Sequence, residues 1–313
     1  MRLYAPAKVN LCLRVLKKRP DGYHNIETIF ERIALFDSIY LRSLPASLGV
    51  SGRIKVFCNN PDVPTGKDSL IYRTAALIRD RARISEGAEI RIFKKIPIAA
   101  GLGGGSSDAA SVLKGLNKMW KASLGNKELI SIGSTLGSDI PFFLSGKTFA
   151  LGSGRGDIVK PLGWKSKFWH IIIYCGAKLL SGDVYGSYSR KLSPGAGEVP
   201  VSDYPRGLRK WNLHGKITSL KKCVKVTRRL RDSVYFAGND LENIVLKKIP
   251  VLSMLKNAMG NTGLGYSLVS GSGPSVFALF TNRKEAVEAR KALVKRFPVI
   301  KKKGWQIFVV STL

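Results

Sequence analysis

The feature that most constrains this chain is a dense run of glycines in the stretch PIAAGLGGGSSDAA, residues 97–110, where glycine fills four of the five positions from 101 to 105. A strand-like pattern, AEIRIFKKIPIAAG, leads into the run, and apolar residues at helical spacing follow it. Neighbouring glycines permit positive φ angles and a close approach to the backbone. Because the free N–H groups and the dipole at a helix N-terminus favour anions, we expect the run to bind a phosphate ester.

Two familiar glycine-rich motifs do not match this run. A Walker A loop requires Lys after its last glycine, and the dinucleotide fingerprint requires a third glycine where this chain has Ser106. Ser106 or Ser107 is expected to cap the following helix, and either hydroxyl can donate to a phosphate or hold a metal ion. The alternative is a tight strand-to-helix turn that binds no ligand.

Polar and apolar residues alternate along the first stretch, LYAPAKVNLCLRVL, which predicts a strand with Lys8 and Asn10 on one face. RPDGYHNIETIF is typical of a Pro-Asp-Gly turn followed by a second strand, so Tyr23 and His24 are placed at the strand entrance. A strand in RIKVFCN and a helix in DSLIYRTAALIRDRAR precede the glycine run. The first half of the chain is therefore predicted to mix strands and helices.

The pattern changes beyond the glycine run. NKELISIGSTLG is typical of a short helix ended by Gly137, and Asp139 falls in the connection to an apolar segment that we expect to be extended. Gly and Pro cluster in LGSGRGDIVKPLG, residues 151–163, which favours a domain boundary there. Beyond it, helices alternate with strands, and YSLVSGSGPSVFALF is typical of a hairpin. Residues 191–232 are irregular and basic. The second half is predicted to be an α+β sandwich.

The formal net charge of +31 over 313 residues exceeds what solubility requires and would attract nucleotides, phosphates, nucleic acid or an anionic membrane. Lys and Arg are spread along the chain, which weakens the case for a dedicated nucleic-acid surface; a generally lysine-rich composition is the alternative. No apolar run reaches the ~20 residues of a membrane span, and the first residues lack a signal layout, so we expect a cytoplasmic protein. Scattered cysteines and histidines predict reduced thiols and no structural zinc site.

Several motifs together resemble one enzyme family. PIAAGLGGGSSDAA is similar to the ATP phosphate loop of the superfamily that contains galactokinase, homoserine kinase and mevalonate kinase. PAKVNL, RPDGYHNIETIF, LGSDIPFF, GNDLE and SGSGPSVFALF resemble further signatures of the 4-diphosphocytidyl-2-C-methyl-D-erythritol kinases, in the same order. The resemblance implies a two-domain α+β fold, with a ribosomal-protein-S5-domain-2-like N-terminal domain that holds a left-handed βαβ unit and a ferredoxin-like C-terminal α/β sandwich.

The activity that the resemblance implies is an ATP-dependent phosphotransfer to the 2-hydroxyl of 4-diphosphocytidyl-2-C-methyl-D-erythritol, in the non-mevalonate isoprenoid pathway, with ATP and Mg²⁺ as cofactors. Residues 1–155 would form the ATP-binding kinase domain and residues 156–313 the substrate-side domain. The implied partners are ATP and a small molecule that carries cytidine diphosphate, with no membrane and no nucleic acid. The sequence leaves the metal ligands and the oligomeric state open.

The resemblance also assigns roles to single residues. It implies Asp139 as the proton acceptor, Lys8 as the charge partner of Asp139, and Asn10 as a contact of the substrate hydroxyl. Tyr23 would stack on the cytosine, and His24 would hydrogen-bond to the base. By pattern alone, the same residues are equally typical of a loop carboxylate, a solvated lysine and ordinary strand packing.

Further contacts of both ligands are implied. Tyr185 in SGDVY matches a second aromatic for the same base, and Ser69 stands where the family carries an Asn near the adenine, which leaves a base-reading role there open. The loop of residues 271–275 either meets the substrate diphosphate or only forms a hairpin turn. The residues expected to contact ATP are Pro97, Gly101, Leu102, Gly103, Gly104, Gly105, Ser106 and Ser107.

Two other functions stand as alternatives. A homoserine or mevalonate kinase would keep the glycine run but has no need of the DGYH stretch, which favours the cytidyl substrate. A basic nucleic-acid-binding protein on a kinase-like fold would account for the charge and predict salt-sensitive binding, but it leaves Lys8, Asp139 and the glycine run unexplained. The basic segment of residues 206–231 is either a solvated face or a contact to an anionic surface.

Overall fold

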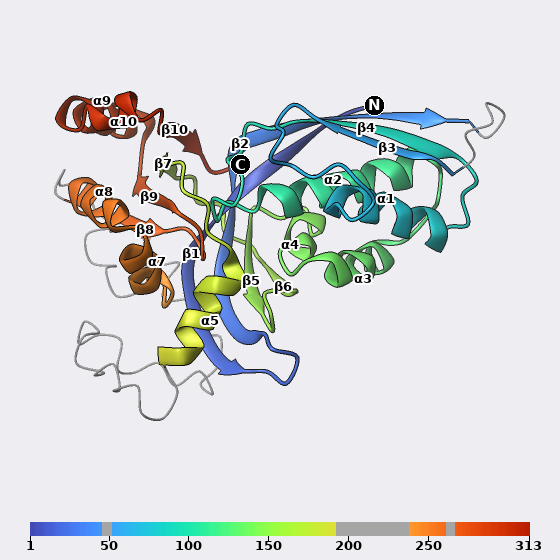
Figure 1. Cartoon of the computed structure of the whole chain (residues 1–313), viewed down its shortest axis with the longest axis horizontal. Coiled ribbons are helices and arrows are strands. Elements are labelled where there is room, and N and C mark those ends of the chain that lie inside the picture. Colours follow the sequence, from blue (N-terminus) through green and yellow to red (C-terminus); the bar gives the residue numbers. More distant parts are fainter. Residues whose placement is uncertain (46–51, 192–237, 261–266) are drawn as a thin grey trace.

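The computed structural model describes residues 1–45, 52–191, 238–260 and 267–313. In these residues the strands form two sheets, each covered by helices, and the two halves meet along the long first strands (Figure 1). The basic segment of residues 206–231 lies outside the described residues. No helix in the described part combines the length and the apolar character of a membrane span.

The first sheet is built on a long antiparallel hairpin formed by the first two strands. Its strands are β1 (Arg2–Lys18), β2 (His24–Leu44), β3 (Ile54–Cys58), β4 (Gly87–Phe93), β5 (Phe149–Ser153) and β6 (Ile158–Leu162). The order is β3-β4-β2-β5-β6, with β1 paired to β2. Among these six described strands, only β3 and β4 pair with each other in parallel, joined through a helix in a βαβ connection. The strands predicted at the start of the chain are confirmed.

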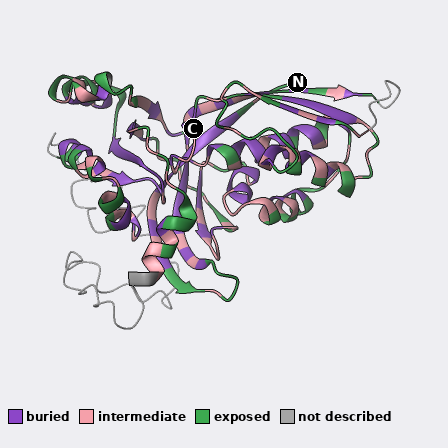
Figure 2. Cartoon of the chain, in the orientation of Figure 1, coloured by how far each residue is buried: buried purple, intermediate pink, exposed green. Residues whose placement is uncertain are grey.

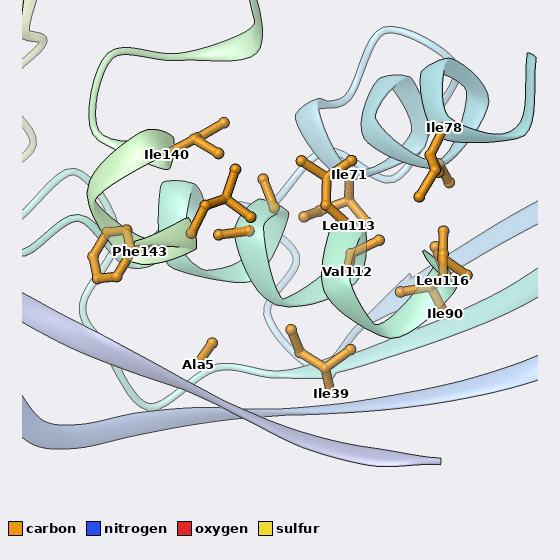
Figure 3. Packing of buried hydrophobic residues seen from close by; sticks show 14 of the residues in the cluster. Ala5, Ile39, Ile71, Ile78, Ile90, Val112, Leu113, Leu116, Ile140 and Phe143 are labelled. Atoms are coloured by element: carbon orange, nitrogen blue, oxygen red, sulfur yellow. The ribbon is translucent and has the colours of Figure 1, made fainter. Parts of the chain in front are cut away.

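Four helices cover one face of this sheet: α1 (Leu70–Arg81), α2 (Gly104–Met119), α3 (Asn126–Leu136) and α4 (Ile140–Leu144). Leu113 and Leu116 of α2 are fully buried and pack toward Ile39 and Ile90 of the strands (Figure 3). Burying a leucine side chain of this kind contributes about 1.5–3 kcal/mol. The apolar spacing after the glycine run thus fixes which face of α2 packs on the sheet, and with it the position of the run.

The second sheet is antiparallel throughout, with the order β10-β7-β9-β8. Its strands are β7 (Trp169–Tyr174), β8 (Ser267–Val269), β9 (Ser275–Phe280) and β10 (Gln306–Ser311), and its helices are α5 (Ser181–Lys191), α7 (Glu242–Lys248), α8 (Pro250–Gly260), α9 (Arg283–Arg296) and α10 (Val299–Lys302). Figure 2 shows buried strands beneath helices with exposed outer sides. This order is that of a ferredoxin-like sandwich, so the predicted α+β class is confirmed.

The two sheets share a buried junction. Ala7 and Val9 of β1 pack in one apolar cluster with Ile172 and Phe277 of the second sheet. Three buried polar residues, Glu31, His170 and Thr312, lie at the same junction. The Nε2 of His170 is 3.0 Å from the Oε1 of Glu31. The hydroxyl of Thr312 donates to the same oxygen of Glu31. The two domains are therefore joined by a packed interface, which fixes the position of one domain relative to the other.

One expectation about the region after α3 differs from the structure. The apolar segment after Asp139 is not extended; it forms the short helix α4, whose five residues are all buried. A short apolar run does not distinguish a strand from a buried helix, and Pro141 in the first turn of α4 is compatible with a helix start. The division at residues 155 and 156 stays a prediction; these residues lie in the turn between β5 and β6, and β6 continues the first sheet to Leu162.

Candidate active site

A cleft of about 470 Å³ lies between the two domains, and it contains most of the residues that the sequence singled out. Lys8, Asp139 and Pro97 line it from the first domain, together with residues 101–106 of the glycine run. The second domain contributes the start of α5 at Ser181 and the β8–β9 turn at Ser272 and Gly273. The structure thus brings the glycine run and the Lys8–Asp139 pair into one site.

Helix α2 begins inside the glycine run. Its first residue is Gly104, and Gly103 precedes it in a left-handed conformation with φ 69° and ψ 16°. Ser106 and Ser107 are therefore inside the first turn, and the expectation that one of them caps the helix is wrong. The N–H groups at the start of the helix belong instead to the glycines and to Ser106, whereas the N–H of Ser107 already donates to the carbonyl oxygen of Gly103 at 2.9 Å. This strengthens the case for an anion at this end of α2.

Protein atoms account for the glycine at position 101. A Cβ atom there would lie 2.1 Å from the carbonyl oxygen of Ser270, and a Cβ atom on Gly273 would lie 2.1 Å from the backbone nitrogen of Gly101. The hydroxyl of Ser270 donates to the carbonyl oxygen of Gly101 at 2.9 Å. The β8–β9 turn therefore packs against the glycine run, and neither backbone has room for a side chain.

The next glycines are also enclosed, with one exception. A Cβ atom on Gly103 would lie 2.9 Å from the side chain of Lys8, and one on Gly104 would lie 3.0 Å from the side chain of Ile96. On Gly105 the nearest atom would be 3.8 Å away. The interpretation that the whole run makes room for phosphates is thus corrected: Gly101, Gly103 and Gly104 make room for the protein itself, whereas a Cβ atom on Gly105 would fit in ordinary contact with Leu70.

Lys8, Asn10 and Asp139 form a compact polar group beside the glycine run. The Nζ of Lys8 lies 3.2 Å from the Oδ2 of Asp139 and donates to the Oδ1 of Asn10 at 2.6 Å. The amide of Asn10 donates to Thr28, whose hydroxyl donates to the carbonyl oxygen of Cys12. Lys8 and Asn10 are buried, whereas the side chain of Asp139 is 26% exposed. Asn10 thus holds the ammonium of Lys8 on its buried side, and the carboxylate of Asp139 is the group that a ligand can reach.

Local structure explains how these groups meet. Lys8 and Asn10 are two residues apart on β1 and point to the same face, as the alternation predicts. The backbone N–H of Lys8 donates to the carbonyl oxygen of Leu102, which ties β1 to the glycine run. Asp139 directly precedes α4, whose buried residues anchor it under the sheet. Three separate segments thus converge through ordinary strand pairing and helix packing.

A second group lies at the start of β2, where Tyr23 and His24 were expected. Tyr23 is 55% exposed, whereas His24 is buried and stacks on Tyr185 of α5 with ring centroids 5.6 Å apart. The hydroxyl of Ser189 lies 2.8 Å from the Nε2 of His24. Burial, and then the nearby charge of Lys18, lower the pKa of His24, so its ring is neutral at pH 7. Both domains therefore contribute aromatic residues to this region.

A buried ionic group lies behind the glycine run. Lys94 forms ion pairs with Asp37 and with Asp108, and the Lys94–Asp108 distance is 2.8 Å. Asp37 also accepts the backbone N–H groups of Lys95 and Ile96, and the Oδ1 of Asp108 has no hydrogen-bond partner. Burial raises the pKa of Asp108 to about 7, against the opposing effect of Lys94. The sequence patterns did not indicate this group, although a lone acid in the apolar stretch ALFDSIY is a signal for a buried pair.

Two further positions have defined structural roles. The hydroxyl of Ser69 accepts the backbone N–H of Tyr72 at 3.2 Å, so Ser69 caps α1. Residues 271–274 lie in the predicted hairpin turn between β8 and β9, and Ser275 begins β9. The amide of Asn239 donates to the carbonyl oxygen of Gly271 in this turn at 2.6 Å. Within the described residues, no group of three or more His, Cys, Asp or Glu is arranged to hold a metal ion.

Comparison with known families supports the arrangement of two domains. Residues 69–147 match the GHMP kinases N terminal domain, and residues 220–299 match the GHMP kinases C terminal domain. A crystal structure of 4-(cytidine 5'-diphospho)-2C-methyl-D-erythritol kinase has a TM-score of 0.74 and 29% identity, and covers 99% of this chain and 98% of its own. A homoserine kinase from Cytophaga hutchinsonii has a TM-score of 0.70 at 18% identity, covers 100% of this chain and 94% of its own, and shares the fold.

Curated relatives match the chain over nearly its whole length. The 4-diphosphocytidyl-2-C-methyl-D-erythritol kinase of Pelobacter propionicus is 35% identical over 100% of this chain and 99% of its own. The enzyme of the same name from Bacillus subtilis is 38% identical over 88% of this chain and 86% of its own. Together with the matching GHMP domains, these similarities show that the chain belongs to the family of 4-diphosphocytidyl-2-C-methyl-D-erythritol kinases.

Proposed function

We propose that this protein transfers the γ-phosphoryl group of ATP to the 2-hydroxyl of 4-diphosphocytidyl-2-C-methyl-D-erythritol, in the non-mevalonate route to isoprenoid precursors. The observation that carries this proposal is the Lys8–Asp139 ion pair in the same cleft as the glycine run. A carboxylate beside a phosphate-binding helix end is the arrangement that phosphoryl transfer to an alcohol requires. The names of the full-length relatives supply the substrate.

Asp139 is the proton acceptor in this proposal. As the hydroxyl oxygen forms a bond to the γ-phosphorus, the bond from that phosphorus to the bridging oxygen breaks, ADP leaves with the electron pair, and the hydroxyl proton passes to Asp139. Lys8 offsets the negative charge of the transferring group and, at 3.2 Å, orients the carboxylate. Asn10 holds Lys8 through its 2.6 Å hydrogen bond and is the expected contact of the substrate hydroxyl.

The phosphates of ATP are assigned to the start of α2. Gly105 and Ser106 both line the cleft there, and the hydroxyl of Ser106 belongs to the first helical turn. Mg²⁺ bound to the nucleotide would neutralise β- and γ-phosphate oxygens. The hydroxyl of Ser107 and the Oδ1 of Asp108 are the kind of oxygen atoms that bind Mg²⁺, and neither has a hydrogen-bond partner. We assign ATP binding to the first domain, with residues 1–155 as its predicted extent, and we expect the second domain, predicted as residues 156–313, to close the substrate side of the cleft together with the start of β2.

The cytosine is assigned to the aromatic group at the start of β2. Tyr23 offers an exposed ring for stacking, and the neutral ring of His24 has one nitrogen that donates and one that accepts. Tyr185 supplies an aromatic ring from the second domain beside His24. A base held between the domains would place the rest of the substrate along the cleft toward Asp139.

The test is ATP consumption by the purified full chain with Mg²⁺, with 4-diphosphocytidyl-2-C-methyl-D-erythritol, mevalonate and homoserine compared as acceptors. We expect turnover of the cytidyl compound alone, and a loss of about 10²–10⁴-fold in kcat for Asp139→Asn. A matched control is Asp80→Asn, because Asp80 lies on α1 with an exposed side chain paired to Arg79. Turnover of another alcohol, or no turnover by the folded protein, would refute the proposal.

A further inference from the structure

Tyr23 lies in a turn whose backbone is well fixed but whose ring is exposed. The backbone N–H of Tyr23 donates to the Oδ1 of Asp21 at 3.1 Å, and its carbonyl oxygen accepts the N–H of Arg19 at 2.7 Å. The ring is 55% exposed, so packing alone does not set its plane. A stacking residue that is free to rotate loses conformational entropy when a base binds. The orientation of this ring therefore needs another source.

Arg155 supplies that orientation from the β5–β6 turn. Its guanidinium carbon lies 5.1 Å from the centroid of the Tyr23 ring, within the range of a cation–π contact. The β5–β6 turn is joined to β2 where the N–H of Ile26 donates to the carbonyl oxygen of Gly154 at 2.7 Å. The cation therefore belongs to a turn that is hydrogen-bonded to the same strand that Tyr23 precedes.

The guanidinium is itself held in a fixed plane. Its Nε and Nη2 donate to the Oδ2 of Asp157 at 3.1 and 2.8 Å, and Nη2 also donates to the carbonyl oxygen of Ser134 near the end of α3 at 3.1 Å. The side chains of Arg155 and Asp157 are only 25% and 18% exposed. Burial acts to raise the pKa of Asp157, but hydrogen bonds from Arg155 and the backbone outweigh it and lower that pKa, so the pair stays ionised at pH 7.

We propose that Arg155 is a positioning residue that determines affinity for the cytidine base by holding the ring of Tyr23. One face of the ring rests on the guanidinium and the other stays available to the base. The inference rests on the proposed function, because it takes Tyr23 as the stacking residue. Arg19 is occupied elsewhere, since its guanidinium donates to Asp21 in the turn and to Asn25 at the start of β2.

The test uses the full chain and the variants Arg155→Met and Arg155→Lys. For Arg155→Met we expect the Kd of cytidine 5'-diphosphate, measured by calorimetry, to rise about two- to fivefold, as the loss of an exposed cation–π contact predicts. The KM for ATP should stay unchanged. Arg155→Lys should give a smaller rise in the Kd, because an ammonium keeps the positive charge. It should still give some rise, because an ammonium lacks the planar group that donates to Asp157 and to Ser134 at the same time.

The decisive measurement repeats Arg155→Met in a Tyr23→Ala background. If Arg155 acts through the ring, it has no further effect on the Kd once the ring is gone. The matched control is Arg91→Met, which removes a cation–π contact of 4.7 Å on Phe57, on the strands β4 and β3; it should leave the Kd unchanged.

Three results would overturn the inference: an unchanged Kd in Arg155→Met, the same rise in the Tyr23→Ala background, or an equal rise in the KM for ATP. In each case the proposed function would stand if the wild type binds cytidine 5'-diphosphate and turns over the cytidyl substrate. Failure of the wild type to bind the cytidine compound would overturn both, and these outcomes are therefore distinguishable.

Discussion

The buried ionic group behind the glycine run allows a sharp prediction about Asp108. Lys94 is the single cation between Asp37 and Asp108, and all three side chains are at most 6% exposed. With both carboxylates ionised the group carries one excess negative charge in a buried place, which is unfavourable. The substitution Asp108→Asn removes that charge and leaves the Lys94–Asp37 pair intact. The asparagine oxygen can still accept from Lys94.

The magnitude follows from the pKa of Asp108. Burial raises this pKa from 3.8 to about 7, so the folded state holds a proton that the unfolded state releases. A raised pKa contributes stability that is present below pH 3.8 and is lost as the pH rises through about 7. Each pKa unit corresponds to about 1.4 kcal/mol, so between pH 5 and pH 8 the wild type should lose about 3 kcal/mol relative to Asp108→Asn. This loss is a large part of the stability of an ordinary domain.

The assay is urea unfolding of both proteins at pH 5 and pH 8, with the free energy of unfolding compared at each pH. We expect the difference to move in favour of Asp108→Asn by about 3 kcal/mol as the pH rises. Asp80→Asn, an exposed position on α1, is the control and should show no such trend. Parallel changes in the wild type and Asp108→Asn would refute the excess-charge argument.

Three other predictions follow from particular contacts. Gly273→Ala should lower the free energy of unfolding by about 1–3 kcal/mol, measured in urea, because its Cβ atom would meet the nitrogen of Gly101 at 2.1 Å. Burial raises the pKa of Cys12 to about 11, so about one thiol in a thousand is ionised at pH 8, and alkylation should be slow until urea unfolds the chain. Burial, and then Lys18, lower the pKa of His24, so the KM for the cytidyl substrate should be constant from pH 7 to pH 8; a marked change would contradict a neutral ring.

Local patterns predicted the parts of the site that depend on one element. The alternation along β1 placed Lys8 and Asn10 on one face, and the Pro-Asp-Gly turn placed Tyr23 before the start of β2, as the structure confirms. These predictions succeed because the side-chain period of a strand and the geometry of a tight turn are set by neighbouring residues. The family resemblance then indicated which of these residues belong together.

Other features depend on segments far apart in the chain, and the sequence did not reveal them. Lys94 meets Asp37 across 57 positions, and the hydroxyl of Ser270 reaches Gly101 across 169 positions. The helical form of α4 after Asp139 also depends on burial from several sides, which a short apolar run does not encode. Pairwise contacts of this kind are set by the packing of whole elements, so no local pattern predicts them.

The contact between the glycine run and the β8–β9 turn gives the glycines a structural role in domain packing. If phosphates alone required them, a Cβ atom on Gly101 would point into the cleft, yet it would meet Ser270 at 2.1 Å. The backbone of the second domain thus forms the surface against which the glycine run packs. The amide of Asn239 donates to the carbonyl oxygens of Val269 and Gly271 and so holds that backbone. Because both backbones lack side chains at the contact, a small shift of one domain would move the loop directly. The position of the glycine run is therefore a property of the interface between the domains, and not of the run alone.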